Sequence, residues 1–158
     1  MSGGDRSLNV VADGFDEVPG RVVEATRATN DEALRHHPAQ GEWSAIEVIG
    51  HLIDKLEIWR SRVEWVASQD HPTLELYDQD RLVQLRGYRT ARLDSLIEAL
   101  GEQSRTFADV LRTLPPEAAK RKGIHPEYGE ITLLRCAEIP LESIDGHLEQ
   151  VRAALATI

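Results

Sequence analysis

The chain has 158 residues, of which 41% are hydrophobic and 28% are charged, as is usual for soluble globular proteins. This length suits one domain that buries a core without disulfides or metals. The formal net charge of -9, with no extended basic run, argues against a nucleic-acid partner held through phosphate contacts.

Cys136 is the only cysteine, so an internal disulfide is impossible and a reducing compartment is expected. No apolar run approaches the length that spans a membrane, and the first residues lack the apolar centre of a signal peptide. We therefore expect a cytoplasmic protein without a membrane partner.

Residues 1–13 are polar and contain glycines, and we expect a flexible tail there, followed by a single domain over residues 14–158. Apolar residues recur at helical spacing from Phe15 to Ala28. Pro19 suits a first helical turn, so the first helix begins between Phe15 and Pro19. A short helical turn is predicted from Asn30 to Leu34.

The second predicted helix runs from about Ser44 to Ala67. Ser44 and Glu47 have capping-box spacing, a hydroxyl followed three residues later by a carboxylate. The helix has a main apolar stripe and a mixed stripe on the opposite side, which comprises Glu47, His51, Asp54, Ile58 and Trp65. A helix with apolar residues on both sides needs cover on both sides, so a homodimer is predicted.

The third predicted helix starts at Asp78 or Asp80 and extends to about Thr113, with a bend permitted at Gly87 or Gly101. An irregular connection over residues 117–130 follows, and Thr132 caps a last helix that reaches the C-terminus. These elements predict an all-α protein, an up-down four-helix bundle with one long connection between helices three and four.

His51 on the second helix and His147 on the fourth are placed where they can face each other inside a bundle. Two imidazoles with a carboxylate suit zinc, nickel or iron and leave coordination positions open for water or substrate. The alternative is that both histidines are ordinary surface or hydrogen-bonded core residues.

Two motifs carry a family resemblance. The first is Glu42-Trp43-Ser44, followed by Glu47, His51 and Leu52, at the start of the second helix. The second is His147-Leu148-Glu149-Gln150-Val151 in the last helix. Together they resemble the signatures of the DinB-like (damage-inducible, YfiT-like) family, over about residues 15–154.

The resemblance implies a four-helix bundle, often dimeric, that holds a divalent metal with one histidine from the second helix and two from the fourth. His51 and His147 match two of these positions, and the middle position is Ser143, a poor ligand. The site is then lost, or completed by a carboxylate such as Glu47, Asp54 or Glu142, or left with two histidines and water. Equally, Glu47 serves only the capping box.

Relatives in this family include thiol-dependent transferases and isomerases, in which a metal activates a small thiol. The resemblance thus implies a thiol-dependent S-transferase, or a hydrolase with water in place of the thiol. His51 and His147 would be ligands, and Glu47 a third ligand or a catalytic base. The alternative is a non-catalytic dimeric bundle, without metal, that binds a small molecule or acts in a stress response.

Overall fold

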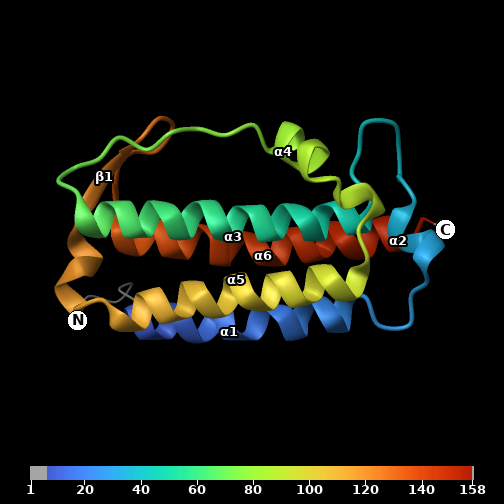
Figure 1. Cartoon of the computed structure of the whole chain (residues 1–158), viewed down its shortest axis with the longest axis horizontal. Helices are drawn as coiled ribbons and strands as arrows, with labels where there is room; N and C mark the ends of the chain where they lie inside the picture. Colours follow the sequence, from blue (N-terminus) through green and yellow to red (C-terminus); the bar gives the residue numbers. More distant parts are fainter. Residues whose placement is uncertain (1–6, 158) are drawn as a thin grey trace.

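The computed structural model describes residues 7–157 and confirms the predicted all-α four-helix bundle (Figure 1). The bundle helices are α1 (Leu8–Ala25), α3 (Ala45–Ser68), α5 (Leu93–Thr113) and α6 (Leu133–Leu155). Between them lie α2 (Asp31–Arg35), α4 (Gln79–Arg86), two 3-10 turns, η1 (Tyr88–Thr90) and η2 (Pro116–Lys120), and the antiparallel hairpin of β1 (Lys122–His125) and β2 (Gly129–Thr132).

The bundle consists of two closely packed pairs, α1 with α5 and α3 with α6, as the side view shows (Figure 1). The core between them is apolar, and Phe15 of α1 stacks on Phe107 of α5 with ring centroids 4.2 Å apart. Both rings are completely buried. Burial of these apolar faces is the main source of stability in such a bundle.

The direction of the helices differs from a simple up-down bundle, because α3 and α5 run the same way (Figure 1). At one end Arg35, the last residue of α2, donates to the carbonyl oxygen of Ala91, just before α5, at 2.7 Å. At the other end Arg121, which follows α5, donates to the carbonyl oxygen of Val66 near the end of α3, at 2.9 Å. Residues 69–92, here called the crossover segment, must therefore return along the whole bundle.

The crossover segment corrects two expectations. The predicted third helix is interrupted, because α4 ends at Arg86. The next residue, Gly87, has a left-handed φ of 66°, which suits glycine. The sequence also predicted one long connection, between helices three and four. That connection is present and contains the hairpin, but the crossover segment is a second long one.

Residues 8–13 of the predicted flexible tail are helical, because α1 starts at Leu8. Ser7 caps it by accepting a hydrogen bond from the amide of Val10 at 3.2 Å. Leu8, Val11 and Ala12 are buried, so this stretch is tied to the core. Pro19 lies inside the helix, and residues 1–6 of the predicted tail lie outside the described part of the chain.

The helix caps predicted at Ser44 and Thr132 are confirmed. In α3 the amide of Ser44 donates to Glu47 Oε1 at 3.1 Å, and the amide of Glu47 donates to Ser44 Oγ at 3.4 Å. In α6 the amide of Arg135 donates to Thr132 Oγ1 at 3.1 Å. These bonds satisfy backbone donors that have no partner within the helix.

The first part of α3 is buried on every side, without a break from Ser44 to Asp54. Its outer side is covered by the crossover segment, where the hydroxyl of Tyr88 donates to Asp54 Oδ1 at 2.5 Å and Arg86 donates to the same oxygen at 2.7 Å. The chain itself therefore covers part of the stripe that the sequence assigned to a second subunit. Trp65, further along, is 47% exposed, and the homodimer stays a prediction.

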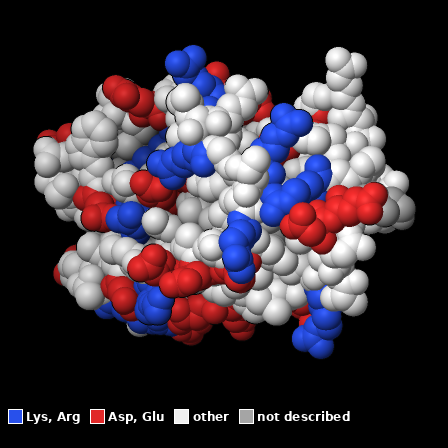
Figure 2. Space-filling view, turned by 45° about the vertical axis from the view of Figure 1, so that its right-hand side comes forward, with Lys and Arg blue, Asp and Glu red and all other residues white. Residues whose placement is uncertain are grey.

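Charges are mixed over the surface drawn in Figure 2, where acidic and basic side chains alternate over the face shown. The net charge of -9 is therefore not gathered into one patch on that face. Among the described residues, no helix is both long and apolar enough to cross a membrane.

We expect Gly50→Ala to lower the free energy of unfolding by about 1–3 kcal/mol. A methyl group at Gly50 would lie 2.2 Å from a ring carbon of Tyr88, so the ring and its segment would have to move. Gly101→Ala is the matched control in α5, because no atom lies within 4 Å of the added methyl. That change should raise stability by up to about 1 kcal/mol through helix propensity. Urea unfolding measures both, and equal effects in the two variants would contradict the packing argument.

Candidate functional site

The structure brings His51 and His147 together, one from α3 and one from α6. Their ring centroids are 4.9 Å apart and the rings are nearly perpendicular, at 77°. Trp43, which precedes α3, also packs against His51, with ring centroids 4.8 Å apart. The capping box fixes the start of α3, so it also fixes where His51 enters the bundle.

Both imidazoles are held neutral. Burial lowers the pKa of His51 to about 3, with further lowering by the charges of His147 and Lys55. Burial also lowers the pKa of His147, as does Lys55, while a hydrogen bond to Gln150 opposes the shift. Because protonation is disfavoured, the lone pairs of both rings stay available as acceptors or metal ligands near neutral pH.

The free nitrogens of the pair can be identified from their contacts. Nδ1 of His147 lies 3.3 Å from Gln150 Oε1. Because that amide oxygen accepts, the proton sits on Nδ1 and the lone pair on Nε2. Nδ1 of His51 is buried and has no hydrogen-bond partner in the described part of the chain. Such an unpaired buried group costs about 1–3 kcal/mol unless a ligand satisfies it.

The other two predicted site residues are engaged elsewhere. The hydroxyl of Ser143 donates to the carbonyl oxygen of Pro140 in its own helix at 2.7 Å. Oε1 of Glu47 accepts from the amide and the hydroxyl of Ser44, and lies 3.3 Å from Nε2 of His37. The carboxylate of Glu47 thus belongs to the start of α3.

The two further carboxylates that the sequence offered also have partners. Asp54 binds Tyr88 and Arg86, as described above. Glu142 accepts from Arg135 at 3.0 Å. A ligand role for Glu142 would have to break its contact with Arg135, whereas Oδ2 of Asp54 is buried without a hydrogen-bond partner in the described chain.

A divalent metal fits this site only in part. Two neutral imidazoles are good ligands for zinc, nickel or iron. Within residues 7–157, however, no group of three or more His, Cys, Asp or Glu side chains is placed to hold an ion. The donors therefore suit an ion held by two imidazoles, with its other positions taken by oxygen atoms from Ser143, water or substrate.

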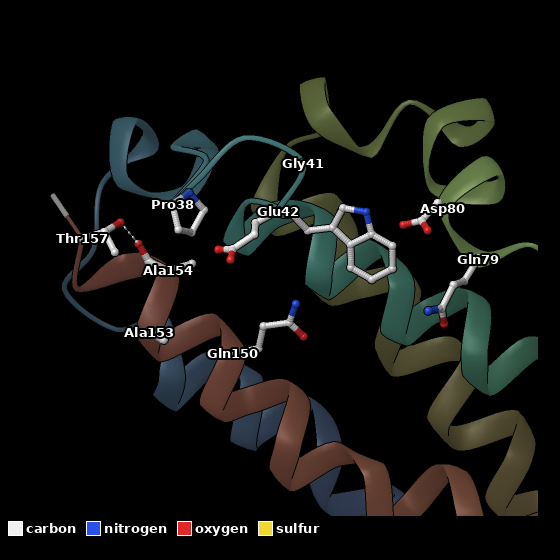
Figure 3. A pocket seen from close by; sticks show the side chains of 10 residues that line it. Pro38, Gly41, Glu42, Gln79, Asp80, Gln150, Ala153, Ala154 and Thr157 are labelled. Carbon is white, nitrogen blue, oxygen red and sulfur yellow. Dashed lines mark hydrogen bonds between the residues drawn. The ribbon is translucent and has the colours of Figure 1, made fainter.

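A pocket of about 570 Å³ lies beside the pair (Figure 3). Trp43, which covers His51, and Gln150, which binds His147, both line it. In the close-up Gln150 comes from α6, whereas Gln79 and Asp80 come from the start of α4. A second pocket of about 640 Å³ shares Trp43 and Asp80 and is lined by His37 and Glu47. The site is thus reached from the side where the crossover segment lies.

Several residues of the site escaped the sequence motifs. Lys55 follows His51 by one helical turn, so periodicity alone could have placed it on the same face. Tyr88 and Arg86 had no such signal, because their role depends on how the crossover segment packs. Cys136 is buried, and burial raises the pKa of its thiol to about 11, as expected for a core residue rather than a nucleophile.

Known proteins with similar sequences point to one family. The chain is 27% identical over 123 residues to the "Putative metal-dependent hydrolase YfiT" of Bacillus subtilis, covering 78% of this chain and 69% of that protein. It is also 27% identical over 121 residues to the "Putative metal-dependent hydrolase OB0782" of Oceanobacillus iheyensis, covering 75% and 69%.

A solved structure shares the fold. It is described as "YfiT from Bacillus subtilis is a probable metal-dependent hydrolase with an unusual four-helix bundle topology". The TM-score is 0.85 at 22% identity, and the match covers 98% of this chain and 90% of the other. The family model described as "DinB superfamily" matches residues 15–151. The chain therefore belongs to the DinB superfamily.

Proposed function

We propose that this protein is a divalent-metal-dependent hydrolase whose metal is held by His51 and His147. The observation that carries the proposal is the pair itself: two neutral rings 4.9 Å apart, one with a buried nitrogen that has no partner. The names of the relatives support a metal-dependent reaction.

The chemistry that zinc, nickel or iron supplies in such sites is a lower pKa for a coordinated water, which makes it a nucleophile near neutral pH. The protein's own groups do the positioning. Gln150 holds the ring of His147 with the Nε2 lone pair free, the role that outer hydrogen bonds play for histidine ligands. Trp43 packs against His51, which is almost completely buried.

Two other functions are to be compared with this one by measuring metal binding. A thiol-dependent S-transferase would use the same histidines, with a small thiol in the place of water. A non-catalytic binding bundle is favoured by one observation, that the described residues contain no third His, Cys, Asp or Glu beside the pair. Metal binding separates this last alternative from both enzymes.

We expect chelator-treated protein to bind about one zinc, nickel or iron ion per chain, measured by titration calorimetry and elemental analysis. His51→Ala and His147→Ala should each weaken binding by more than about tenfold, because each removes half of the imidazole ligands. His71→Ala is the control, since His71 is exposed and lies at the other end of α3. If wild type binds none of the three metals, the metalloenzyme proposal is wrong.

Ser143→His should tighten zinc binding by at least about tenfold. Position 143 lies one turn before His147 in α6, so an imidazole there supplies the ligand that the chain lacks. The same calorimetric titration measures the change. An unchanged affinity would indicate that another residue already completes the site.

Glu47→Ala distinguishes a ligand from a cap. The change should lower the free energy of unfolding by about 0.5–1.5 kcal/mol, since it removes the carboxylate that accepts from Ser44 and contacts His37. Zinc affinity should change by less than about threefold, against the larger loss expected on removal of a ligand. A tenfold loss of affinity with unchanged stability would make Glu47 the third ligand.

A further inference from the structure

A third cavity, a cleft of about 400 Å³, lies further along α3 beyond the histidine pair, where the crossover segment and the β1–β2 hairpin meet the helix. Its volume is in the range of small-molecule sites. The groups that define its chemistry are two cations, Lys55 and Arg62, one imidazole, His125, and the rings of Trp59, Tyr77 and Tyr128. None of them is a candidate metal ligand.

Arg62 is a buried cation without a counter-ion. The residue is 6% exposed, and its guanidinium carbon lies 4.4 Å above the ring of Trp59 and 5.9 Å from that of Tyr77. One of its nitrogens donates to the carbonyl oxygen of Glu75, and no carboxylate pairs with it among residues 7–157. Buried charges in proteins are normally paired, so this one is arranged for an anion from outside.

Lys55 adds a second unpaired cation. It is half-buried, and within the described chain its ammonium has neither a hydrogen bond nor an ion pair. Two carboxylates, Asp78 and Glu127, also line the cleft, but both are exposed to solvent. Asp78 in addition caps α4 by accepting from the amide of Arg81 at 3.0 Å. The cations thus lie inside and the carboxylates at the rim, where water screens them.

His125 supplies a neutral donor. Its Nδ1 accepts hydrogen bonds from the amides of Glu127 at 3.0 Å and Tyr128 at 3.2 Å. The proton of the neutral ring therefore sits on Nε2, which has no partner in the described chain. The ring is 4% exposed and lies parallel to Trp59, with centroids 5.8 Å apart and an interplanar angle of 3°. Burial lowers the pKa of His125, so the ring stays neutral.

We propose that this cleft binds a small aromatic carboxylate. The carboxylate would accept hydrogen bonds from Lys55 and Arg62, with the Nε2–H of His125 as a further donor. The planar body would pack on the rings of Tyr77 and Tyr128, because Trp59 is buried against Arg62 and His125. The wall of aromatic rings favours a flat ligand, and the cations favour an acid over its neutral analogue. The anion-binding groups are not metal ligands, although the charge of Lys55 also acts on the two histidines.

Benzoate and its neutral isostere benzamide test the proposal with the full chain, after chelator treatment. In a titration followed by NMR of the indole N–H signals, benzoate should bind at least about tenfold more tightly than benzamide and should shift the signal of Trp59. Lys55→Met should weaken benzoate binding by about tenfold or more, whereas Lys120→Met, an exposed lysine outside the cleft, should not. Arg62→Lys gives a second variant that keeps the charge and loses the fork of donors.

The contrary results are equally specific. Equal affinity for benzoate and benzamide, or benzoate binding that survives Lys55→Met and Arg62→Lys unchanged, would overturn the proposal. So would a benzoate-dependent shift of Trp43 without one of Trp59, because that would place the acid in the pocket beside the histidine pair. His51→Ala should leave benzoate binding intact, so a failure of the metal proposal and a failure of this one are told apart.

Discussion

Tyr88 packs over Gly50 and donates its hydroxyl to Asp54, and this contact holds the crossover segment on α3. The arrangement of the molecule depends on it. The crossover segment allows α3 and α5 to run in the same direction, and it covers the side of α3 that carries Gly50 and Asp54. It also lines the pocket beside the histidine pair, the pocket at Glu47 and the cleft of Arg62. One docked segment therefore shapes every cavity along this side of the bundle that enters the functional argument.

The fold was predictable where local chemistry decides it. Apolar periodicity located the four bundle helices, and side-chain caps marked the starts of α3 and α6 at Ser44 and Thr132. The errors lie where tertiary packing decides. Leu8 and its neighbours are helical because the core binds them, although the composition there suggests a tail. The return path along the bundle depends on the docking of Tyr88, for which the sequence shows no local pattern, whereas Gly87 was one of the glycines at which a bend was expected.

The candidate site was also predictable only where helical periodicity decides the position of a residue. Helical periodicity placed His51 and His147 on faces that meet, and the structure brings the rings together. It could not show which side chains would be occupied by other contacts. Glu47 accepts a hydrogen bond from Ser44 at the start of α3, and Ser143 donates one to a carbonyl oxygen of its own helix. The sequence did not indicate Arg62 as a functional residue, because only the folded structure shows that it has no counter-ion.

The parallel course of α3 and α5 has a consequence for how the chain folds. An antiparallel helical hairpin closes through a short loop, whereas this pair meets only after residues 69–92 have spanned the bundle, and β1 then pairs with the beginning of that span at Thr73. Contacts between segments far apart in the sequence slow the search for the native topology, because chain entropy is lost before those contacts form. The molecule should fold more slowly than an all-antiparallel bundle of the same length and stability, with the placement of the crossover segment among its last steps.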